Sequence, residues 1–347
     1  MPQRGPMRLL LAGFGNVGRE LAGILARRDA YPGLAELDVA VVGITTGSHG
    51  ALADSRGIDL ASALAWFCEH GRFASGRPDF AALDTAGAVA GLDYDVLVEL
   101  SPLSVAGRGE PAIAHIRGAL ERGRHVVSAN KGPLAWAYRE LTSLAEERGC
   151  ALLYEATVMD GAPVFSLARH GLRGNTIERI EGVLNSTTNV MLGEMERGAS
   201  VAEAVAAAQR AGVAEADPAA DIEGWDAAAK VAVLANALMG ADLTPDQVER
   251  ESVAAVTATR IAAAGSRGCR VKMMCEAFRD GGTVRGRVRA REVRRDDPLA
   301  LVEGTGSLIR FVTDILGTLT VAEERPDLAT TAYGVIADLF AVRLSRA

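Results

Sequence analysis

The densest group of charged residues on an otherwise apolar stretch lies between Gly212 and Lys230. The stretch reads GVAEADPAADIEGWDAAAK, and its last acid, Asp226, precedes Lys230 by four positions. Side chains four residues apart lie on one face of a helix. Burying a lysine on an apolar, alanine-rich helix is costly unless it is paired, and burial makes its proton easier to transfer. This spacing suits acid–base chemistry, and it equally suits a surface ion pair worth roughly 0.2–0.5 kcal/mol.

A glycine-rich turn near the amino terminus has the spacing of a dinucleotide-binding loop. It lies between an apolar run at 8–12 and a segment of helical periodicity. In that context the first glycine permits a tight turn, the second lets a pyrophosphate approach the backbone, and the third allows close helix–strand packing. We therefore expect a cofactor-binding loop, and not a turn needed only for packing, at Gly13, Phe14, Gly15, Asn16, Val17 and Gly18.

The residues that follow the apolar run at 39–44 bear on the choice of dinucleotide. A carboxylate at this point binds the ribose 2′-hydroxyl of NAD. This chain has Thr45-Thr46-Gly47-Ser48-His49 instead. Hydroxyl groups can bind a 2′-phosphate, and there is no acid to repel one. We therefore expect Thr45 to contact the cofactor and NADP to be preferred, with NAD as the alternative.

The elements that must position these residues fall into two groups. Strands and helices alternate over residues 1–150, which predicts an α/β domain with a doubly wound parallel sheet of the Rossmann type. Ligands bind such sheets at the carboxyl ends of the strands. The expected strands are 8–12, 39–44, 96–100 and 125–128, and the expected helices include 111–122 and 133–148.

The pattern changes after Cys150, so we expect a second, α+β domain over 151–328. A final helix at about 329–347 is expected to pack back on the first domain. Ser200 and Glu203 have the spacing of a capping box, and Gly281-Gly282 suits a hairpin turn. The remaining expectations are strands at 152–158, 177–185, 271–278, 283–293, 307–312 and 315–321, and helices at 200–210, 226–239 and 330–342.

Composition and charge exclude several classes of protein. The 347 residues are 49% hydrophobic and 23% charged, as in an ordinary globular protein. The net charge of −7 argues against general binding to nucleic acids or acidic membranes. No apolar run approaches the ~18–20 residues that span a bilayer. Because the start of the chain does not resemble a secretory signal and the four cysteines form no CxxC pair, we expect a cytoplasmic protein without disulfides or structural zinc.

Taken together, these motifs resemble those of the homoserine dehydrogenases. The stretch 212–230 is similar to the family's long motif, in which Ala-Glu-x-Asp-Pro precedes Asp-x-x-Gly-x-Asp-Ala-Ala-x-Lys. The glycine loop and the segments SANK at 128–131 and EATV at 155–158 match in order and approximate spacing. The resemblance covers nearly the whole chain and corresponds to the short, monofunctional form of the family.

The resemblance implies interconversion of L-homoserine and L-aspartate 4-semialdehyde with NAD(P), a step in threonine, methionine and isoleucine biosynthesis. It implies that Lys230 is the general acid–base with Asp226 as its partner, and that Lys131 lies beside the nicotinamide and the substrate. Glu215 would bind the substrate ammonium group, and Asp221 would be a second substrate-facing acid. These residue types agree with the chemistry, since a lysine can protonate the alkoxide that forms when hydride reaches an aldehyde.

The resemblance also implies a cofactor contact at Ser101, a homodimer and a monovalent cation. The second domain would carry the dimer interface as well as the substrate site. Sodium or potassium would be held by Glu155 and by the main-chain carbonyls of Val158, Asp160 and Ala162. Two segments depart from the family pattern: Met159-Asp160-Gly161 stands where small residues are usual, and the turn at 324–328 lacks glycine.

Two other functions stay open at this point. The chain could be another Rossmann dehydrogenase of a small amino or hydroxy acid, or a non-catalytic NADP-binding sensor. The sensor would not need the proton-transfer lysine, so Lys230 argues against it. Arg285, Arg287, Arg289 and Arg291 alternate along one strand, and we favour cross-strand pairing or a solvated face for them over an anionic partner.

Overall fold

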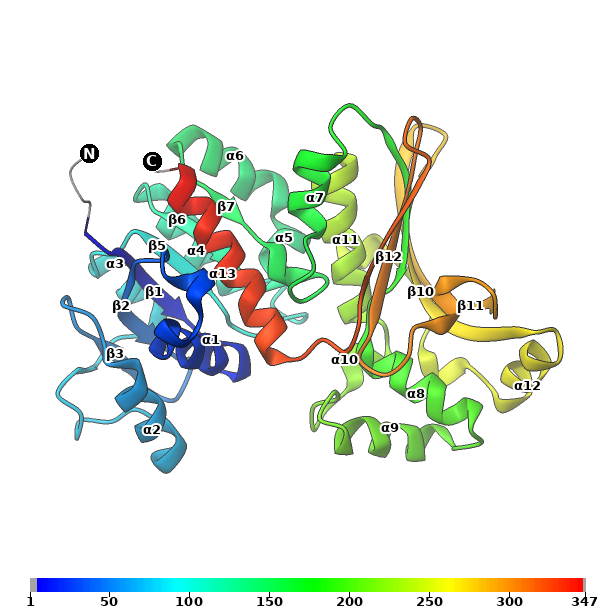
Figure 1. Ribbon diagram of the computed structural model, residues 1–347, viewed down its shortest axis with the longest axis horizontal. Coiled ribbons are helices and arrows are strands. Elements are labelled where there is room, and N and C mark those ends of the chain that lie inside the picture. Colours follow the sequence, from blue (N-terminus) through cyan, green and yellow to red (C-terminus); the bar gives the residue numbers. More distant parts are fainter. Residues whose placement is uncertain (1–4, 346–347) are drawn as a thin grey trace. The chain divides into compact units, whose positions relative to one another are not determined.

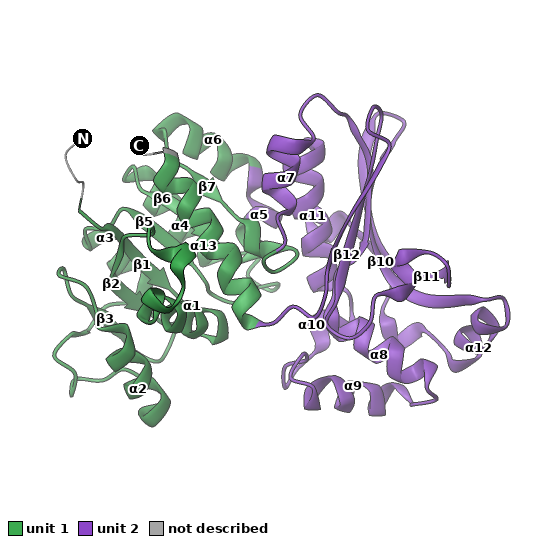
Figure 2. Ribbon diagram, in the orientation of Figure 1, with its two compact units in different colours: residues 1–133, 139–161, 328–347 green, residues 134–138, 162–327 purple. Residues whose placement is uncertain are grey.

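The computed structural model describes residues 5–345 and divides into two compact units (Figure 2). Unit 1 comprises Met1–Pro133, Arg139–Gly161 and Leu328–Ala347, and unit 2 comprises Leu134–Tyr138 and Ala162–Asp327. The chain therefore leaves unit 1 and returns to it. The returning segment carries α13 (Leu328–Ser345), drawn in red in Figure 1.

Unit 1 is built on a seven-stranded sheet with the order β4-β3-β2-β1-β5-β6-β7. Its five parallel strands are β1 (Met7–Ala12), β2 (Val39–Thr45), β5 (Val96–Glu99), β6 (His125–Ser128) and β7 (Leu152–Leu153). The antiparallel strands β3 (Ala51–Ala53) and β4 (Phe80–Ala81) extend one edge. Leu9, Leu10 and Leu11 are fully buried, as a parallel strand covered on both faces requires. The predicted doubly wound parallel sheet is confirmed.

Helices cover both faces of this sheet (Figure 1). On one face Leu9 and Leu11 join a core cluster with Leu21 of α1 (Asn16–Ala26) and Val335 of α13. Because side chains alternate along a strand, Leu10 points to the opposite face. There α3 (Thr85–Gly91) and α4 (Ala112–Glu121) pack on the strands. Two further helices of unit 1 are α2 (Leu60–His70) and α6 (Tyr138–Arg148).

Two elements between residues 131 and 158 differ from their prediction. The helix expected at 133–148 is divided into α5 (Lys131–Trp136) and α6. The strand expected at 152–158 ends at Leu153 and continues as a 3-10 turn, Glu155–Thr157. Other hydrogen bonds replace the ladder there: Thr157 Oγ1 donates to the nearby Tyr154 carbonyl at 2.7 Å, and the Glu155 N–H donates to Asp338 of the distant helix α13 at 2.8 Å.

Unit 2 contains a six-stranded sheet with the order β13-β12-β8-β10-β11-β9. The predicted hairpin is confirmed, and Gly281 and Gly282 supply its turn with φ of 55° and 87°. The strand expected from 315 begins three residues later, because Leu316 lies in the preceding turn and its N–H donates to Asn175 Oδ1. The strands are β8 (Ile177–Val183), β9 (Glu249–Arg250), β10 (Cys269–Asp280), β11 (Thr283–Arg294), β12 (Ser307–Thr313) and β13 (Thr318–Glu323).

The long helix α11 (Trp225–Met239) packs on β10 and β11. At Gly286 a Cβ atom would lie 2.8 Å from Val231 Cγ1 of α11, so only glycine permits this approach. Because Gly286 faces α11, the alternating arginines of β11 point to the opposite face. The predicted capping box at Ser200 and Glu203 is present. The other helices of the unit are α7 (Val164–Gly171), α8 (Ser186–Glu196), α9 (Val201–Arg210), α10 (Ala219–Ile222) and α12 (Ala258–Ser266).

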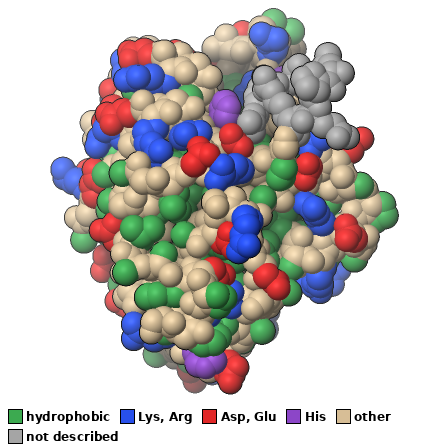
Figure 3. Space-filling model, turned by 90° about the vertical axis from the view of Figure 1, so that its left-hand side faces the viewer, with side chains coloured by type: hydrophobic (Ala, Val, Ile, Leu, Met, Phe, Trp, Pro, Cys, Tyr) green, Lys and Arg blue, Asp and Glu red, His purple; other side chains and the backbone are tan. Residues whose placement is uncertain are grey.

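None of the helices in the described part of the chain is long and apolar enough to cross a membrane. On the face of the molecule drawn in Figure 3, acidic and basic side chains are interspersed, and neither sign forms a continuous patch.

Candidate active site

A cavity of about 920 Å³ opens in unit 1 at the carboxyl ends of β1, β2 and β5. Strand order reverses between β1 and β5, since β1 lies between β2 and β5 in the sheet. In open parallel sheets this switch point is where ligands bind. The lining comes from the loops after these three strands, and it includes Gly13, Phe14 and Gly15 of the glycine loop.

The three glycines of the loop meet different surroundings. Gly13 has φ of 116°, and a Cβ there would lie 2.7 Å from the Leu100 carbonyl carbon. A Cβ on Gly18 would lie 2.7 Å from the Gly13 oxygen, whereas one on Gly15 would meet nothing within 4 Å. Gly13 and Gly18 therefore close the turn, and Gly15 leaves space beside the first N–H groups of α1. Such N–H groups bind phosphate well.

The end of β2 places hydroxyl groups differently from the prediction. Thr45 is 1% exposed, and its Oγ1 accepts a hydrogen bond from Thr85 Oγ1 at 3.0 Å. Its hydroxyl is therefore buried in the protein and does not line the cavity. The cavity is lined instead by Thr46, Gly47, Ser48 and His49. Among the described lining residues Asp84 is the only carboxylate, and it caps α3 by accepting the Gly87 N–H at 2.7 Å.

Arg19 also lines the cavity, and the prediction did not include it. Its guanidinium donates to Asn16 Oδ1 at 2.8 Å and to the Phe14 carbonyl at 3.2 Å. It lies over the Phe67 ring, 5.5 Å from the centroid. These contacts hold a permanent positive charge next to the glycine loop. The position four residues after Gly15, on the first turns of the helix, is the signal that could have identified it.

The end of β5 contributes a buried carboxylate that the sequence analysis treated only as part of a strand. Glu99 accepts hydrogen bonds from the Ser101 N–H at 2.9 Å and from the Ser101 hydroxyl, and His115 Nδ1 lies 3.3 Å away. Asn130 Nδ2 donates to Ser101 Oγ at 3.1 Å. Ser101 and His115 both line the cavity, so Glu99 fixes the orientation of two cavity residues.

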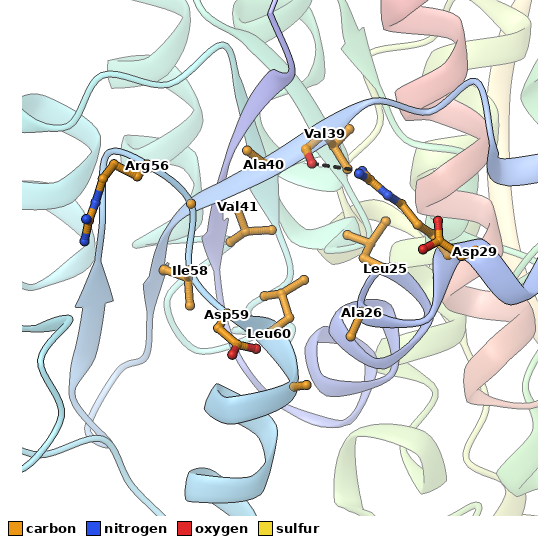
Figure 4. A pocket seen from close by; sticks show the side chains of 13 residues that line it. Leu25, Ala26, Asp29, Val39, Ala40, Val41, Arg56, Ile58, Asp59 and Leu60 are labelled. Carbon is orange, nitrogen blue, oxygen red and sulfur yellow. Dashed lines mark hydrogen bonds between the residues drawn. The ribbon is translucent and has the colours of Figure 1, made fainter.

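A second hollow in unit 1, of about 490 Å³, lies at the opposite end of β2 (Figure 4). Leu25, Val41, Ile58 and Leu60 line it, and Arg28 donates to the carbonyl of Val39 at 3.2 Å. Two of its charged residues have partners: Asp59 caps α2, and Arg56 pairs with Asp54. Because it adjoins the amino end of the strand, it is not where this fold binds nucleotides.

In unit 2 the segments α8, α10 and α11 bring together the acids and the lysine predicted from the sequence. Asn185 Nδ2 lies 2.7 Å from Asp221 Oδ1 and 3.1 Å from Asp226 Oδ2. Lys230, one turn further along α11 than Asp226, donates from Nζ to the Leu184 carbonyl at 2.6 Å. The lysine is half-buried and is held by a main-chain group. The structure therefore brings Asp221, Asp226 and Lys230 into one cluster.

The electrostatics of this cluster favour proton exchange. Burial, and then the neighbouring charge of Asp226, raise the pKa of Asp221 above its usual value, while the hydrogen bonds of Asn185 and Thr187 and the Lys230 charge oppose the shift. Burial raises the pKa of the nearby Cys275 thiol to about 12, so the thiol stays neutral. Two facing carboxylates with one raised pKa mark a functional site more often than a purely structural one.

Two other predicted residues lie outside the contacts of this cluster. Glu215 is exposed on the segment between α9 and α10, and its main-chain carbonyl accepts a hydrogen bond from Gln209 at 3.2 Å. Lys131 belongs to unit 1, where it begins α5 and is half-buried. Asn185 and Thr187, which are not among the predicted site residues, contact the acids directly.

The residues predicted to hold a monovalent cation have other contacts. Glu155 and Val158 are buried in unit 1, whereas Ala162 begins a stretch of unit 2. Asp160 has φ of 45°, and its carboxylate accepts a hydrogen bond from Thr331 of α13 at 2.7 Å. Its carbonyl oxygen lies against Gly334 of α13. Because both polar groups of Asp160 face α13, we derive no step through a cation.

The described part of the chain has no cluster of side chains suited to bind another kind of metal ion. Among residues 5–345, no cluster of three or more His, Cys, Asp and Glu side chains could hold a metal ion.

The cavity suits a dinucleotide, because a phosphate-binding helix start meets a groove at the switch point of a parallel sheet. The acid–lysine cluster suits proton transfer at a hydroxyl or carbonyl group. Fold and site together define a nicotinamide-dependent dehydrogenase.

Comparison with known proteins narrows this class to one family. A family model described as "Homoserine dehydrogenase, NAD binding domain" matches residues 13–155, and one described as "Homoserine dehydrogenase" matches 163–340. The "NAD(+)-dependent homoserine dehydrogenase" of Pseudomonas canavaninivorans is 36% identical over 343 residues, which is 97% of this chain and 96% of the relative. The chain belongs to the homoserine dehydrogenase family, whose members are NAD(P)-dependent oxidoreductases acting on CH–OH groups.

Solved structures agree with this assignment. A putative homoserine dehydrogenase from Archaeoglobus fulgidus has a TM-score of 0.85 and 32% identity, covering 97% of this chain and 99% of that one. A hyperthermophilic archaeal homoserine dehydrogenase in complex with NADPH has a TM-score of 0.83 and 28% identity, with 98% of both chains covered.

Proposed function

We propose that this protein interconverts L-homoserine and L-aspartate 4-semialdehyde with NAD(P), within threonine, methionine and isoleucine biosynthesis. The observation that carries the proposal is the cluster of Asp221, Asp226 and Lys230. A zwitterionic amino-acid substrate needs carboxylates for its ammonium group and a proton donor for its reacting oxygen. This chain supplies both kinds of group within one unit.

Lys230 is the general acid–base in this proposal. Its bond to the Leu184 carbonyl fixes Nζ, so the ammonium can donate a proton to an alkoxide without first being reoriented. A bound nicotinamide supplies or accepts the hydride. In the direction of homoserine oxidation, the neutral amine of Lys230 takes the hydroxyl proton. Asp226 is its partner, and Lys131 is a second lysine at the reacting groups.

Substrate recognition is assigned to the acids of unit 2. Asp221 faces the substrate ammonium together with Asp226, and Glu215 is a further partner for that group. Glu215 is exposed and its carboxylate is therefore available to a ligand, although its segment lies apart from the contacts of the cluster.

For the cofactor we propose a preference for NADP. Arg19, Thr46 and Ser48 line the cavity and can receive a 2′-phosphate, and the lining carboxylate Asp84 is already used as a helix cap. Thr45 supports the turn through Thr85, and Ser101 is held at the end of β5 by Glu99. The Pseudomonas relative is named as NAD(+)-dependent, and the archaeal neighbour was crystallised with NADPH, so both dinucleotides occur in the family.

Three further expectations of the sequence analysis stay predictions. They are a homodimer formed through unit 2, a cytoplasmic location, and a sodium or potassium ion at Glu155, Val158, Asp160 and Ala162.

The test is a steady-state assay of the purified protein with L-homoserine and either NADP or NAD, followed at the nicotinamide absorbance band. We expect oxidation of homoserine with higher kcat/KM for NADP. Oxidation of another small hydroxy acid, but not homoserine, would support a different dehydrogenase. Tight NADP binding without turnover of any such substrate would support a sensor.

A further inference from the structure

The amide of Asn185 has a fixed orientation at the acid cluster. Asn185 caps α8, and its Oδ1 accepts the Thr188 N–H at 2.8 Å. Because the amide oxygen is used by the cap, the two N–H donors must face the acids. One reaches Asp221 Oδ1 at 2.7 Å and the other reaches Asp226 Oδ2 at 3.1 Å. Asn185 is 8% exposed, so the two carboxylates are held side by side by a buried amide.

The second oxygen of Asp221 faces a hydroxyl that has only one proton to give. Thr187 Oγ1 lies 3.0 Å from Asp221 Oδ2 and 2.9 Å from the carbonyl oxygen of Val213. A carbonyl oxygen can only accept, whereas a hydroxyl both donates and accepts. If Thr187 donates to Val213, the contact with Asp221 needs a proton on Asp221 Oδ2. The hydrogen-bond geometry is therefore complete when Asp221 is a carboxylic acid.

The charged groups around Asp221 agree with this arrangement. From α11 it faces the carboxylate of Asp226 and the ammonium of Lys230, and from α8 it faces the neutral side chains of Asn185 and Thr187. Two carboxylates held close together do not both ionise readily when they are partly buried. Burial and the Asp226 charge raise the pKa of Asp221, and they outweigh the hydrogen bonds of Asn185 and Thr187 and the charge of Lys230, which lower it.

We propose that Asp221 and Asp226 share one proton in the substrate-free protein, carried on Asp221 Oδ2, and that binding of the substrate ammonium group releases it. The inference rests on the proposed function. The O–H bond of Asp221 breaks, the proton passes to the buffer, and the ammonium group becomes the cation of the pair. No electron transfer is involved. Asn185 and Thr187 act as positioning residues that make the exchange possible.

This exchange would also select the substrate. An ammonium group replaces a proton, so the charge of the cluster stays constant on binding. A ligand of the same length without the amino group brings no cation to displace the proton. The site would therefore distinguish an amino acid from the corresponding hydroxy acid by charge replacement as well as by direct contact.

The test is isothermal titration calorimetry of L-homoserine into protein saturated with NADPH, which provides no hydride acceptor and so prevents turnover. At each pH, comparing two buffers that both buffer at that pH but differ in ionisation enthalpy gives the number of protons released. Over a series from about pH 5 to about pH 8, we expect the number of protons released to be largest at the lowest pH and to fall as Asp221 ionises in the free protein. An ordinary aspartate, with a pKa near 3.9, is already more than about 90% ionised at pH 5.

The ligand 4-hydroxybutanoate, which lacks the amino group, is the matched probe. We expect it to bind without proton release or to give no binding heat. Proton release with this probe, or the absence of release with homoserine at every pH in the range, would overturn the proposal.

Three variants, Asp221→Asn, Thr187→Val and Asn185→Ser, separate the roles of these residues. Asp221→Asn removes the stored proton, so binding of homoserine should release none. Thr187→Val removes the acceptor for that proton, so the midpoint of proton release should move to lower pH. A move to higher pH would mean that Thr187 donates to an ionised Asp221, and it would overturn the assignment. Thr313→Val, which removes another buried hydroxyl of unit 2, is the control and should leave the midpoint unchanged.

The third variant, Asn185→Ser, keeps a residue that caps helices well and removes both amide donors. Because those donors favour ionised carboxylates, the midpoint should move to higher pH while thermal stability stays near that of wild type. An unmoved midpoint would show that Asn185 only caps α8. Should a variant fail to fold, the wild-type measurement with the two ligands still decides the proposal.

The proposed function and this inference fail in different ways. A protein that does not oxidise L-homoserine with either dinucleotide, or gives no binding heat with it, contradicts the proposed function. A protein that oxidises homoserine but binds it without proton release contradicts only the shared proton.

Discussion

Unit 2 contains two groups of acidic side chains that lie partly or fully out of solvent, and the partners of the acids differ between them. On the face of the six-stranded sheet away from α11, Glu276 is fully buried and Glu181 nearly so. Arg291 Nη1 lies 2.9 Å from each of these two glutamates. Arg310 lies 3.0 Å from Glu181, and Arg289 lies 3.0 Å from Glu276.

Register explains the arrangement on the sheet. Arg310, Glu181, Glu276 and Arg287 occupy opposite positions on the neighbouring strands β12, β8, β10 and β11. Two acids therefore stand between two arginines, and further arginines come from neighbouring positions on the same strands. The cross-strand pairing expected for the arginines of β11 is what the structure contains.

The cluster at α11 has the opposite balance. Asp221 and Asp226 both accept hydrogen bonds from the neutral amide of Asn185, and Lys230, whose charge acts on Asp221, donates to a main-chain carbonyl. The acids on the sheet therefore have arginine cations beside them, whereas the two acids at α11 lie close together, an arrangement in which two partly buried carboxylates do not both ionise readily. In the proposal above, a ligand cation displaces the proton that they share, so this arrangement suits a binding site.

The largest effect that tests this difference is expected at Lys230. Lys230→Ala should lower turnover by about 10²–10⁴-fold, equivalent to a barrier at least ~2.7 kcal/mol higher, because the general acid–base is lost. NADP affinity should change little, since the glycine loop belongs to unit 1. Pre-steady-state turnover and NADP binding should be measured on one preparation. A folded variant with turnover within a few-fold of wild type would show that Lys230 is not the general acid–base, and Lys131 would be the next candidate.

A substitution of Glu276 tests whether the acids on the six-stranded sheet have a structural role. Glu276→Ala leaves several arginines without their shared carboxylate, and losing one partner of a buried ion pair costs about 3–5 kcal/mol. Urea unfolding should show that loss, while the folded variant keeps its KM for homoserine. Glu178→Ala, an exposed acid on β8, is the control, with an expected change within about 0.5 kcal/mol. Equal effects of the two substitutions would argue against a structural network.

Lys272 extends the comparison to a buried cation held by neutral groups. It is 3% exposed, and its Nζ donates to Asn189 Oδ1 at 2.9 Å and to the Val302 carbonyl. Burial lowers its pKa to about 8. Between that value and the unfolded value near 10.4, the unfolded chain binds more protons, so stability rises with pH.

The measurement for Lys272 is urea unfolding of wild type and Lys272→Met at several pH values. The free energy of unfolding of wild type, relative to the variant, should rise by about 3 kcal/mol between roughly pH 7 and pH 10.5. A difference that does not change with pH would mean that folding leaves the pKa of Lys272 unchanged.

The smallest effect is expected at Arg289, which lies at the exposed edge of the ion pairs on the six-stranded sheet. Arg289 is 39% exposed, and Glu276 keeps Arg287 and Arg291 when Arg289 is removed. Arg289→Met should therefore change stability by about 0–1 kcal/mol, as is usual for an exposed ion pair. A loss comparable to that of Glu276→Ala would show that the arginines act as one unit and cannot replace each other.

Local patterns in the sequence were sufficient for the elements whose cause is local. The glycine loop follows from strand, turn and helix signals within a few residues, and the capping box at Ser200 and the turn at Gly281 need only their neighbours. The start of α11 and the face shared by Asp226 and Lys230 follow from helical periodicity. These features depend on backbone conformation over one or two turns, which nearby side chains determine.

Tertiary structure decided which of these groups meet. Thr45 and Thr46 are equivalent candidates in the sequence, but strand β2 turns the first into the interior and the second toward the cavity. Asn185 is 36 residues from Asp221, and only the packing of α8 against α10 gives its amide the role of holding the acids. The sequence alone determined the family, the dinucleotide loop and the identity of the acid–base candidate. Partners, burial and hence protonation were decided by long-range contacts, because desolvation and charge act through space and not along the chain.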